Sequence, residues 1–279
     1  MVTCVNLFGT MPPANTQPDN KMMRALVAFA LKEEFAPWRR KHRFRRVANS
    51  SYSVSVASLG SIEVHVALVG AGAHNADHVH DLTARLQPSV GVVTGVAAGL
   101  KPEWRSGDMV VAHSVCGSSG DAKLSSDPTL IDLAVQCGAK EAPALITLPR
   151  IARTIDEKVN LATVADIADM ESLTVMKQWS ACGIPALALR VILDPVDMPM
   201  TCDFEAAMGA DGQMRIGRLL GQLARQPQLL PDFLRLARQS RRALAILACF
   251  LDRFFDRLER HRRSYMSLGP HTQRDVVQE

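Results

Sequence analysis

The sequence predicts an α/β fold with a mainly central sheet, and three observations lead to this prediction. Segments rich in β-branched and apolar residues alternate along the chain with segments whose apolar residues recur at helical spacing. The run VGVVTG at residues 90–95 has no polar alternation, which is typical of a strand buried on both faces. Finally, 47% hydrophobic and 22% charged residues over 279 residues exclude disordered, collagen-like and small disulfide-rich proteins.

The expected elements follow from these periodicities. Period-two or continuous apolar runs predict strands at residues 24–30, 52–57, 64–69, 90–94, 109–112 and 186–192. Helix-period apolar residues predict helices at residues 75–86, 129–137, 155–161 and 170–182. Because ligands bind beyond the carboxyl ends of the strands in such sheets, the residues that follow each strand are the first candidates for a site.

The residue pattern and the distribution of charge divide the chain into three parts. Residues 1–21 are expected to be a flexible leader, residues 22–212 a catalytic domain, and residues 213–279 a basic amphipathic helical extension. Residues 213–263 hold twelve arginines and four acidic residues, whereas the whole chain has a net charge of only +4. Such a segment is attracted to anionic surfaces. It is either a helix packed on the sheet or on a second subunit, or a helix lying on a membrane surface.

The sequence also indicates where in the cell the protein works and whether it binds a metal. The longest apolar run, residues 243–251, is well short of the roughly 20 residues that span a bilayer. The amino terminus does not resemble a secretory signal, and six scattered cysteines fit reduced thiols. We therefore expect a cytoplasmic protein, either free or peripheral to the inner face of the membrane. No metal site and no nucleic-acid partner are expected, since the histidines after residue 73 lack cysteine neighbours and the basic segment lacks interleaved aromatic residues.

Short polar or glycine-rich groups follow the first strands. Glu33 and Glu34 open a helix, where they act either as partners of the helix dipole or as a general base. Gly70 and Gly72 follow the strand at 64–69 and allow a ligand to approach the backbone. A dinucleotide site is disfavoured because the third glycine of that fingerprint is missing.

Two further groups complete the candidate site. Thr94, Gly95 and Ala97 are small residues that leave room for a flat ligand after a buried strand. Glu171 opens a helix and Asp194 ends the last predicted strand, so both carboxylates can reach one pocket. Two such groups suit the binding of sugar hydroxyls and the protonation of a leaving group.

In this order, over about residues 24–197, the segments resemble the nucleoside phosphorylase and nucleosidase superfamily, which splits N-glycosidic bonds of purine and related nucleosides. The resemblance rests on TGVAAG (94–99), GDMVV (107–111), DMES (169–172) and RVILD (190–194). It implies a three-layer α/β/α sandwich with a mixed, partly barrel-like sheet. It also implies a homo-oligomer whose subunits complete each other's pockets.

The resemblance assigns roles to individual residues. Glu34 would activate water, Glu171 would hold the ribose hydroxyls, and Met170 would pack against the sugar. Asp194 would protonate the purine nitrogen so that the base leaves neutral. Further substrate contacts are expected from Gly70, Gly72, Thr94, Gly95 and Ala97. These roles suit an oxocarbenium-like transition state, which both leaving-group protonation and nearby carboxylates stabilise.

Departures from the superfamily pattern bear on the reaction. Leu193 stands where many relatives have serine, and Ala71 stands where they have serine before a glycine. The phosphate-binding arginine of the phosphorylases is absent before Gly95, which favours hydrolysis, because a phosphate dianion calls for a charged bidentate partner. Phosphate remains an alternative co-substrate, and no other cofactor is expected. A nucleoside-binding module without activity is the competing hypothesis.

One branch of the superfamily resembles the chain further. Residues 151–158, 193–199 and 211–244 look like the hopanoid-associated phosphorylase-like enzymes, whose substrate is adenosylhopane. That resemblance implies release of adenine in hopanoid biosynthesis, and a substrate dissolved in the bilayer would give the basic helices a reason to contact the membrane. Nucleosidases acting on methylthioadenosine and adenosylhomocysteine, or on futalosine, are the alternative.

Overall fold

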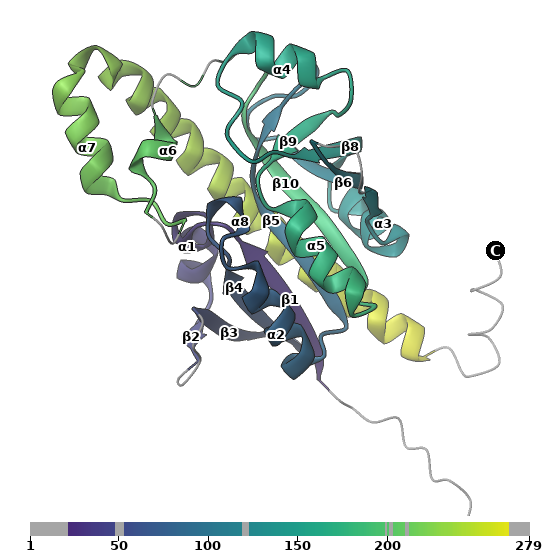
Figure 1. The fold of residues 1–279 in the computed structure, drawn as a ribbon. Coiled ribbons are helices and arrows are strands. Elements are labelled where there is room, and N and C mark those ends of the chain that lie inside the picture. The colour runs from purple at the N-terminus through teal and green to yellow at the C-terminus, as the bar shows by residue number, and fades with distance from the viewer. Residues whose placement is uncertain are drawn as a thin grey trace, which may run out of the picture.

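A central mixed sheet with helices on both faces forms the protein (Figure 1). The structure is a computed structural model that describes residues 22–47, 53–118, 123–198, 200, 203–209 and 212–267. Ten strands within these residues belong to one sheet. The predicted three-layer α/β/α architecture is confirmed, while the predicted leader, residues 1–21, lies outside the described residues.

The parallel centre of the sheet is made by β1 (Met23–Phe29), β4 (Ile62–Leu68) and β5 (Val90–Gly99). Strand β1 lies between the other two, and its residues alternate between the two faces. Val27 faces one hydrophobic core and Ala28 faces the other, and both are fully buried. A strand with two buried faces needs apolar residues at successive positions, which explains its continuous apolar sequence.

Part of the sheet closes on itself. Strand β5 pairs with β10 on one side and with β9 further along, and the path through β10, β6, β8 and β9 returns to β5. The strands that join β5 in this ring are β6 (Met109–Gly117), β8 (Lys140–Thr147), β9 (Ile167–Asp169) and β10 (Ala186–Asp194). This closure makes the sheet partly barrel-like.

Short strands complete the sheet at its margins. β3 (Val54–Leu59) pairs antiparallel with β4, and β2 (Arg45–Arg46) pairs with β3. β7 (Lys123–Ser125) pairs with β6.

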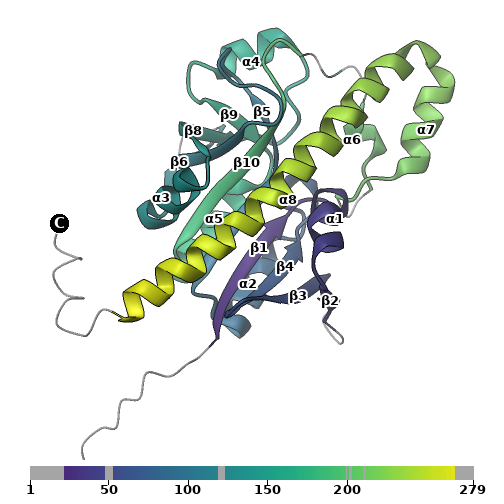
Figure 2. The same ribbon diagram turned by 180° about the vertical axis from the view of Figure 1, so that it is seen from behind.

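Helices cover the two faces unequally. α2 (Ala76–Leu86) and α5 (Ser172–Ala181) pack on one face, whereas the opposite face carries α1 (Lys32–Lys41), α3 (Pro128–Gln136) and α8 (Leu230–Ser267). Figure 2 shows α8 running obliquely across the whole of its face.

Smaller helices follow the carboxyl ends of β4, β8 and β10, where a site is expected (Figure 1). They are η1 (Ala71–Ala73), α4 (Ile155–Leu161), α6 (Phe204–Ala207), α7 (Ile216–Arg225) and η2 (Pro227–Leu229).

Helix α8 belongs to the main core along much of its length. Leu247, Leu251 and Phe254 are at most 1% exposed and share a core with β1 and β5. The ring of Phe255 stacks on Trp38 of α1 with a centroid distance of 5.6 Å. This stretch of the predicted extension therefore packs on the sheet. Among the described residues, no helix is both long and apolar enough to cross a membrane.

Candidate active site

Predicted site residues lie just beyond the end of β1, within the second half of β5 and at the end of β10. Gly95 of β5 lies between the side chains of Glu34 and Arg190, because a Cβ atom built on it would stand 2.6 Å from Glu34 Oε1 and 2.9 Å from Arg190 Nη1. Its φ of +148° also disfavours a side chain. Glycine at this position lets a carboxylate and a guanidinium approach the same strand from two sides.

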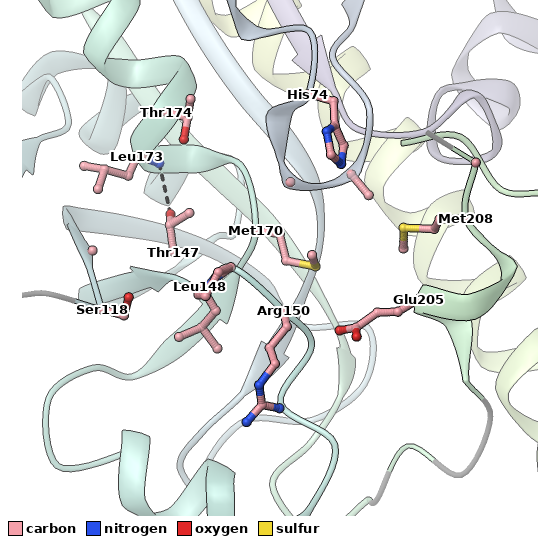
Figure 3. Close-up of a pocket in the computed structure, with 15 residues that line it drawn as sticks. His74, Ser118, Thr147, Leu148, Arg150, Met170, Leu173, Thr174, Glu205 and Met208 are labelled. Carbon is pink, nitrogen blue, oxygen red and sulfur yellow. Dashed lines mark hydrogen bonds between the residues drawn. The ribbon is translucent and has the colours of Figure 1, made fainter. Parts of the chain in front are cut away.

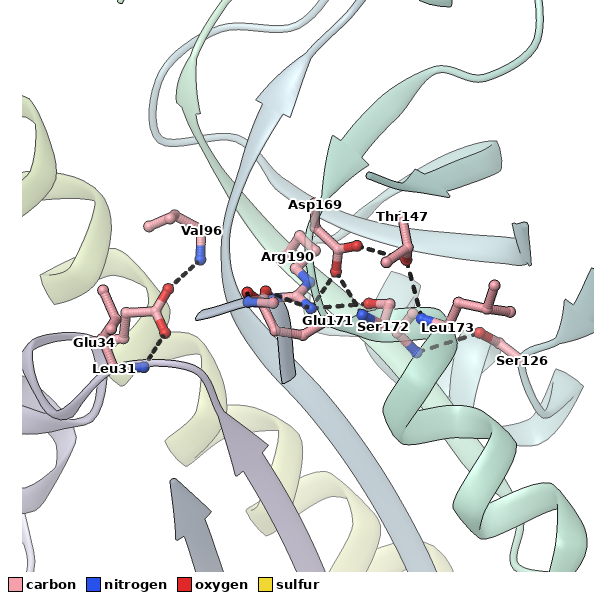
Figure 4. Close-up of polar contacts among 12 residues, drawn as sticks. Leu31, Glu34, Val96, Ser126, Thr147, Asp169, Glu171, Ser172, Leu173 and Arg190 are labelled. Atoms are coloured by element: carbon pink, nitrogen blue, oxygen red, sulfur yellow. Dashed lines mark hydrogen bonds and ion pairs between the residues drawn. The ribbon is translucent and has the colours of Figure 1, made fainter. Parts of the chain in front are cut away.

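Glu34 is held by backbone amides at the start of α1. The carboxylate is 5% exposed and accepts hydrogen bonds from Leu31 N at 3.0 Å and Val96 N at 2.9 Å (Figure 4). Burial raises the pKa of Glu34, and the two amides oppose that shift. A carboxylate in one fixed orientation with a raised pKa has the properties of a general base.

Arg190 organises the opposite side of the site. It is fully buried on β10, and its Nη2 donates to Ser172 Oγ at 2.8 Å and pairs with Asp169. The same nitrogen lies 3.8 Å from Glu171 Oε2 (Figure 4). Asp169 also accepts hydrogen bonds from Ser172 N and Thr147 Oγ1 at 3.0 and 2.8 Å. These contacts join β8, β9, α5 and β10 around one buried cation.

Glu171 connects this network to the glycine turn after β4. Its Oε1 accepts a hydrogen bond from Gly72 N at 2.9 Å, and Gly72 has a φ of +70°. Burial, reinforced by the negative charge of Asp169, raises the pKa of Glu171 to about 8. The structure thus brings together Glu171 and Gly72, which lie 99 residues apart in the sequence.

A cavity of about 740 Å³ opens beside these residues, within the size range of small-molecule sites (Figure 3). Of the predicted site residues, Gly72 and Met170 line it, and Glu171 is hydrogen-bonded to the amide of Gly72. The remaining predicted residues are not part of its lining. Lining residues that sequence reasoning did not propose include His74, Ser118, Thr147, Leu148, Arg150, Glu205 and Met208.

Asp194 ends β10 and pairs with a buried lysine. The carboxylate is 5% exposed, and its Oδ2 lies 2.8 Å from Nζ of Lys158, a fully buried residue of α4. Lys158 also donates to the carbonyl oxygens of Pro195 and Met198 at 2.9 and 2.8 Å. Burial raises the pKa of Asp194 to about 6, and the lysine opposes that shift. Its ion pair is therefore with α4 rather than with the network around Glu171.

Two buried side chains near the predicted residues have unpartnered polar atoms. Within the described part of the chain, Thr94 Oγ1 and the Nε and Nη1 atoms of Arg190 have no hydrogen-bond partner. Unpaired buried polar atoms are costly, and a bound ligand is one way to satisfy them. Thr94 was a predicted contact, whereas Arg190 was not, although a single arginine in the apolar strand ALALRVILD marks it.

Gly70 lies where it was expected, just after the end of β4, whereas the prediction for Ala97 was wrong: Gly95 and Ala97 were expected to follow a strand ending at residue 94, but β5 continues to Gly99 because it pairs with β10 and β9 over these residues. Gly70 has a φ of +76° and precedes η1, and Ala97 is 4% exposed in β5. No group of three or more histidine, cysteine or acidic side chains that could hold a metal ion occurs among the residues the structure describes.

Comparison with known proteins identifies the family of the chain. A model of the phosphorylase superfamily matches residues 24–225. The chain belongs to the phosphorylase superfamily. The superfamily prediction is thus confirmed, although comparison with curated proteins gives no match.

Solved structures of superfamily nucleosidases share the fold. The 5′-methylthioadenosine/S-adenosylhomocysteine nucleosidase of Campylobacter jejuni is 16% identical, with a TM-score of 0.62 over 84% of this chain and 98% of its own. Futalosine hydrolase of Helicobacter pylori is 15% identical, with a TM-score of 0.63 over the same shares. A putative nucleosidase of the first type from Francisella philomiragia is 18% identical, with a TM-score of 0.64 over 85% of this chain and 100% of its own.

Proposed function

We propose that the protein hydrolyses the N-glycosidic bond of a purine nucleoside. The observation that carries this proposal is the pair of buried carboxylates, Glu34 and Glu171, close enough that the charge of Glu34 helps to raise the pKa of Glu171. Glu171 in turn is hydrogen-bonded to Gly72, which lines a cavity within the size range of small-molecule sites. Burying two carboxylates near each other costs stability. Such a cost is typical of sites that stabilise a positive charge during a reaction.

Glu171 and Met170 would bind the sugar. Glu171 Oε1 is engaged by the Gly72 amide, which leaves Oε2 to accept hydrogen bonds from ribose hydroxyls. Met170 lines the cavity, where its flexible thioether suits packing against a sugar ring. In its ionised form Glu171 would also stabilise the positive charge that develops on the sugar as the bond to the base breaks, and that positive charge would in turn lower the raised pKa of Glu171.

Asp194 and Glu34 would move the protons. Asp194, with a pKa near 6, gives a proton to the purine nitrogen, so that the bond to the anomeric carbon breaks and the base leaves neutral. Glu34 takes a proton from water, whose oxygen forms the new bond to the same carbon. The overall reaction consumes one water and releases a free base and a free sugar.

Water is preferred to phosphate as the acceptor because the charges of Arg190 and Arg150, two arginines in the described part of the site, are already paired with carboxylates. The residues before Gly95 are Val93 and Thr94, and the buried Arg190 is already paired with Asp169. A phosphate dianion would require a charged partner of its own. Phosphorolysis stays the alternative reaction, and phosphate its co-substrate.

For the substrate we propose adenosylhopane, on the sequence resemblance described above. The apolar lining residues Leu148, Leu173 and Met208 suit a hydrophobic 5′ substituent. A lipid substrate would place the protein in the cytoplasm, peripheral to the inner face of the membrane, and the superfamily resemblance suggests a homo-oligomer. Nucleosides of the methylthioadenosine, adenosylhomocysteine or futalosine type, and binding without turnover, are the alternatives.

Adenine release from a hydrophobic 5′-substituted adenosine in detergent tests the reaction, with and without phosphate. We expect release without phosphate and a decrease of roughly 10²–10⁴-fold in Asp194→Asn, which cannot donate the proton. Asp197→Asn removes an exposed carboxylate three residues further on and should release adenine at the wild-type rate.

Each other outcome has a distinct meaning. Release only with phosphate would reassign the protein as a phosphorylase. Stabilisation by the nucleoside without release, measured as a rise in Tm, would favour the binding module.

A further inference from the structure

Exposed apolar side chains are concentrated on three helices. Of the eight large hydrophobic residues that are exposed in the described part of the chain, seven lie on or next to α4 and on α7 and the start of α8. We call these seven residues the apolar rim: Ile155, Val159, Val164, Ile216, Leu220, Leu230 and Leu234. The eighth, Met22, directly precedes β1.

The two parts of the apolar rim lie on either side of the cavity. Leu148, Pro149 and Arg150 line the cavity and lead into α4. Glu205 and Met208 line its other side and precede α7. In both views α7 and the first turns of α8 project from the body as a helical hairpin, and α4 stands at the same end of the molecule (Figures 1 and 2).

The exposed side of the hairpin is not needed for its own packing. Leu219 and Leu223 are the buried residues of α7, at 6% and 8% exposure. Ile216 and Leu220, on the adjacent side of the same helix, are more than half exposed. Helix α7 therefore has a wide apolar stripe, of which only a part is covered within this chain.

The hairpin is also strongly basic. Residues 213–242 contain seven arginines and a single acidic residue, Asp232, which pairs with Arg235. All seven arginines are exposed: Arg215, Arg218, Arg225, Arg235, Arg238, Arg241 and Arg242. Apolar side chains bordered by arginine are typical of helices that lie in the headgroup region of an anionic bilayer.

We propose that the apolar rim and the arginines of the hairpin form a docking surface for an anionic lipid bilayer, which places the mouth of the cavity against the membrane. A second copy of this chain is the less favourable occupant of this surface. The seven arginines of its hairpin would lie against the seven arginines of the first copy, and like charges repel. Anionic headgroups complement that charge instead. The surface binds lipid whether or not the cavity catalyses a reaction.

Flotation with vesicles tests the proposal directly. The full chain is mixed with vesicles of equal parts phosphatidylglycerol and phosphatidylcholine, or of phosphatidylcholine alone. We expect the protein to float with the anionic vesicles, with at least a tenfold lower bound fraction on the neutral ones and a loss of binding at high salt.

Two variants separate the apolar and the charged contributions. Ile216→Ser with Leu220→Ser removes apolar side chains, and Arg238→Glu with Arg241→Glu reverses two charges that have no ion pair among the described residues. Both pairs should lower binding at least tenfold. Arg85→Glu with Lys177→Glu changes the net charge equally on exposed positions of α2 and α5, on the other face of the sheet, and should bind as the wild type does.

Several results would overturn the proposal. One is equal binding of all variants to the vesicles. A second is that the protein does not bind anionic vesicles although its far-ultraviolet spectrum and Tm show that it is folded. A third is that the protein is retained on DNA but does not bind vesicles. A smaller molecular mass of the Ile216→Ser, Leu220→Ser variant in sedimentation, again without vesicle binding, would assign the surface to a second copy. Hydrolysis of a soluble nucleoside is measured separately, so the failure of one proposal does not imply failure of the other.

Discussion

At the residue scale, the pairing of Asp194 with Lys158 determines how the proposed acid titrates. Burial alone would keep Asp194 protonated well above its ordinary range, and the lysine 2.8 Å away lowers that pKa again, so that it lies at about 6. Lys158 is itself held by backbone carbonyls of the segment after β10. It is a positioning residue, since it acts on the reaction through Asp194.

This pairing predicts a pH profile. An acid must be protonated to donate, so kcat/KM should fall as the pH rises through about 6. In Lys158→Met the pKa of Asp194 rises, because the cation that lowers it is lost, and the descending limb should move to higher pH by about one unit or more. Initial rates between pH 5 and pH 9 measure the descending limb of the wild type and that of Lys158→Met.

Matched variants control this experiment. Lys177→Met removes an exposed lysine of α5 and should leave the limb in place, and Lys158→Arg, which keeps the charge, should leave it near the wild-type position. An unchanged limb in a folded Lys158→Met protein would show that Lys158 does not act on the acid.

At the element scale, hydrophobic periodicity predicted the elements that bury a continuous apolar face. The expected strands at 24–30 and 186–192 and the expected helix at 155–161 agree closely with β1, β10 and α4. β8 was not predicted, because its sequence KEAPALIT begins with two charged residues and contains Pro143. Closure of the ring of strands places β8 between β6 and β9, and this long-range pairing overrides its weak local preference.

Helix α8 was predicted from its periodicity, but its environment was not. Its heptad-like apolar residues indicated an amphipathic helix, but they did not reveal what the apolar face covers. In the structure Phe254 is fully buried against the sheet, whereas Leu234, twenty residues earlier in the same helix, is 43% exposed. One amphipathic pattern thus serves the core at one end and the docking surface at the other.

The two ends of α8 should differ in their contribution to stability. Phe254→Ala should lower the free energy of unfolding by about 3–5 kcal/mol, since it leaves a cavity in the core. Leu234→Ala should change it by less than about 1 kcal/mol. Urea denaturation followed by circular dichroism measures both, and similar losses in the two variants would contradict the packing of α8 described here.

At the scale of the whole molecule, the buried carboxylates make stability depend on pH. Glu171 has an ordinary pKa of 4.5 in the unfolded chain and about 8 in the folded protein, so the folded state binds the extra proton between these values. Its stabilising effect is therefore complete below about pH 4.5 and is lost as the pH rises through about 8. The loss is on the order of 3–5 kcal/mol over this window.

Glu171→Gln removes this dependence, because glutamine stays neutral. We expect the Tm of the wild type to fall, relative to that of the variant, as the pH rises from 5 to 8. Glu103→Gln, at an exposed position, should follow the wild type. Parallel curves for the wild type and Glu171→Gln would show that Glu171 has an ordinary pKa in the folded protein. Differential scanning calorimetry at several pH values measures the three curves.

The sequence by itself determined the fold class and most of the elements around the candidate site, and it proposed Glu34, Glu171 and Asp194 as site carboxylates, since apolar period and residue type are local properties. Only the tertiary structure decided which groups these carboxylates meet. Asp194 and Lys158 are 36 residues apart, and Glu171 and Gly72 are 99 apart. The free energy of burying a charge depends on its partners, and those partners come from other strands and helices once the sheet has closed.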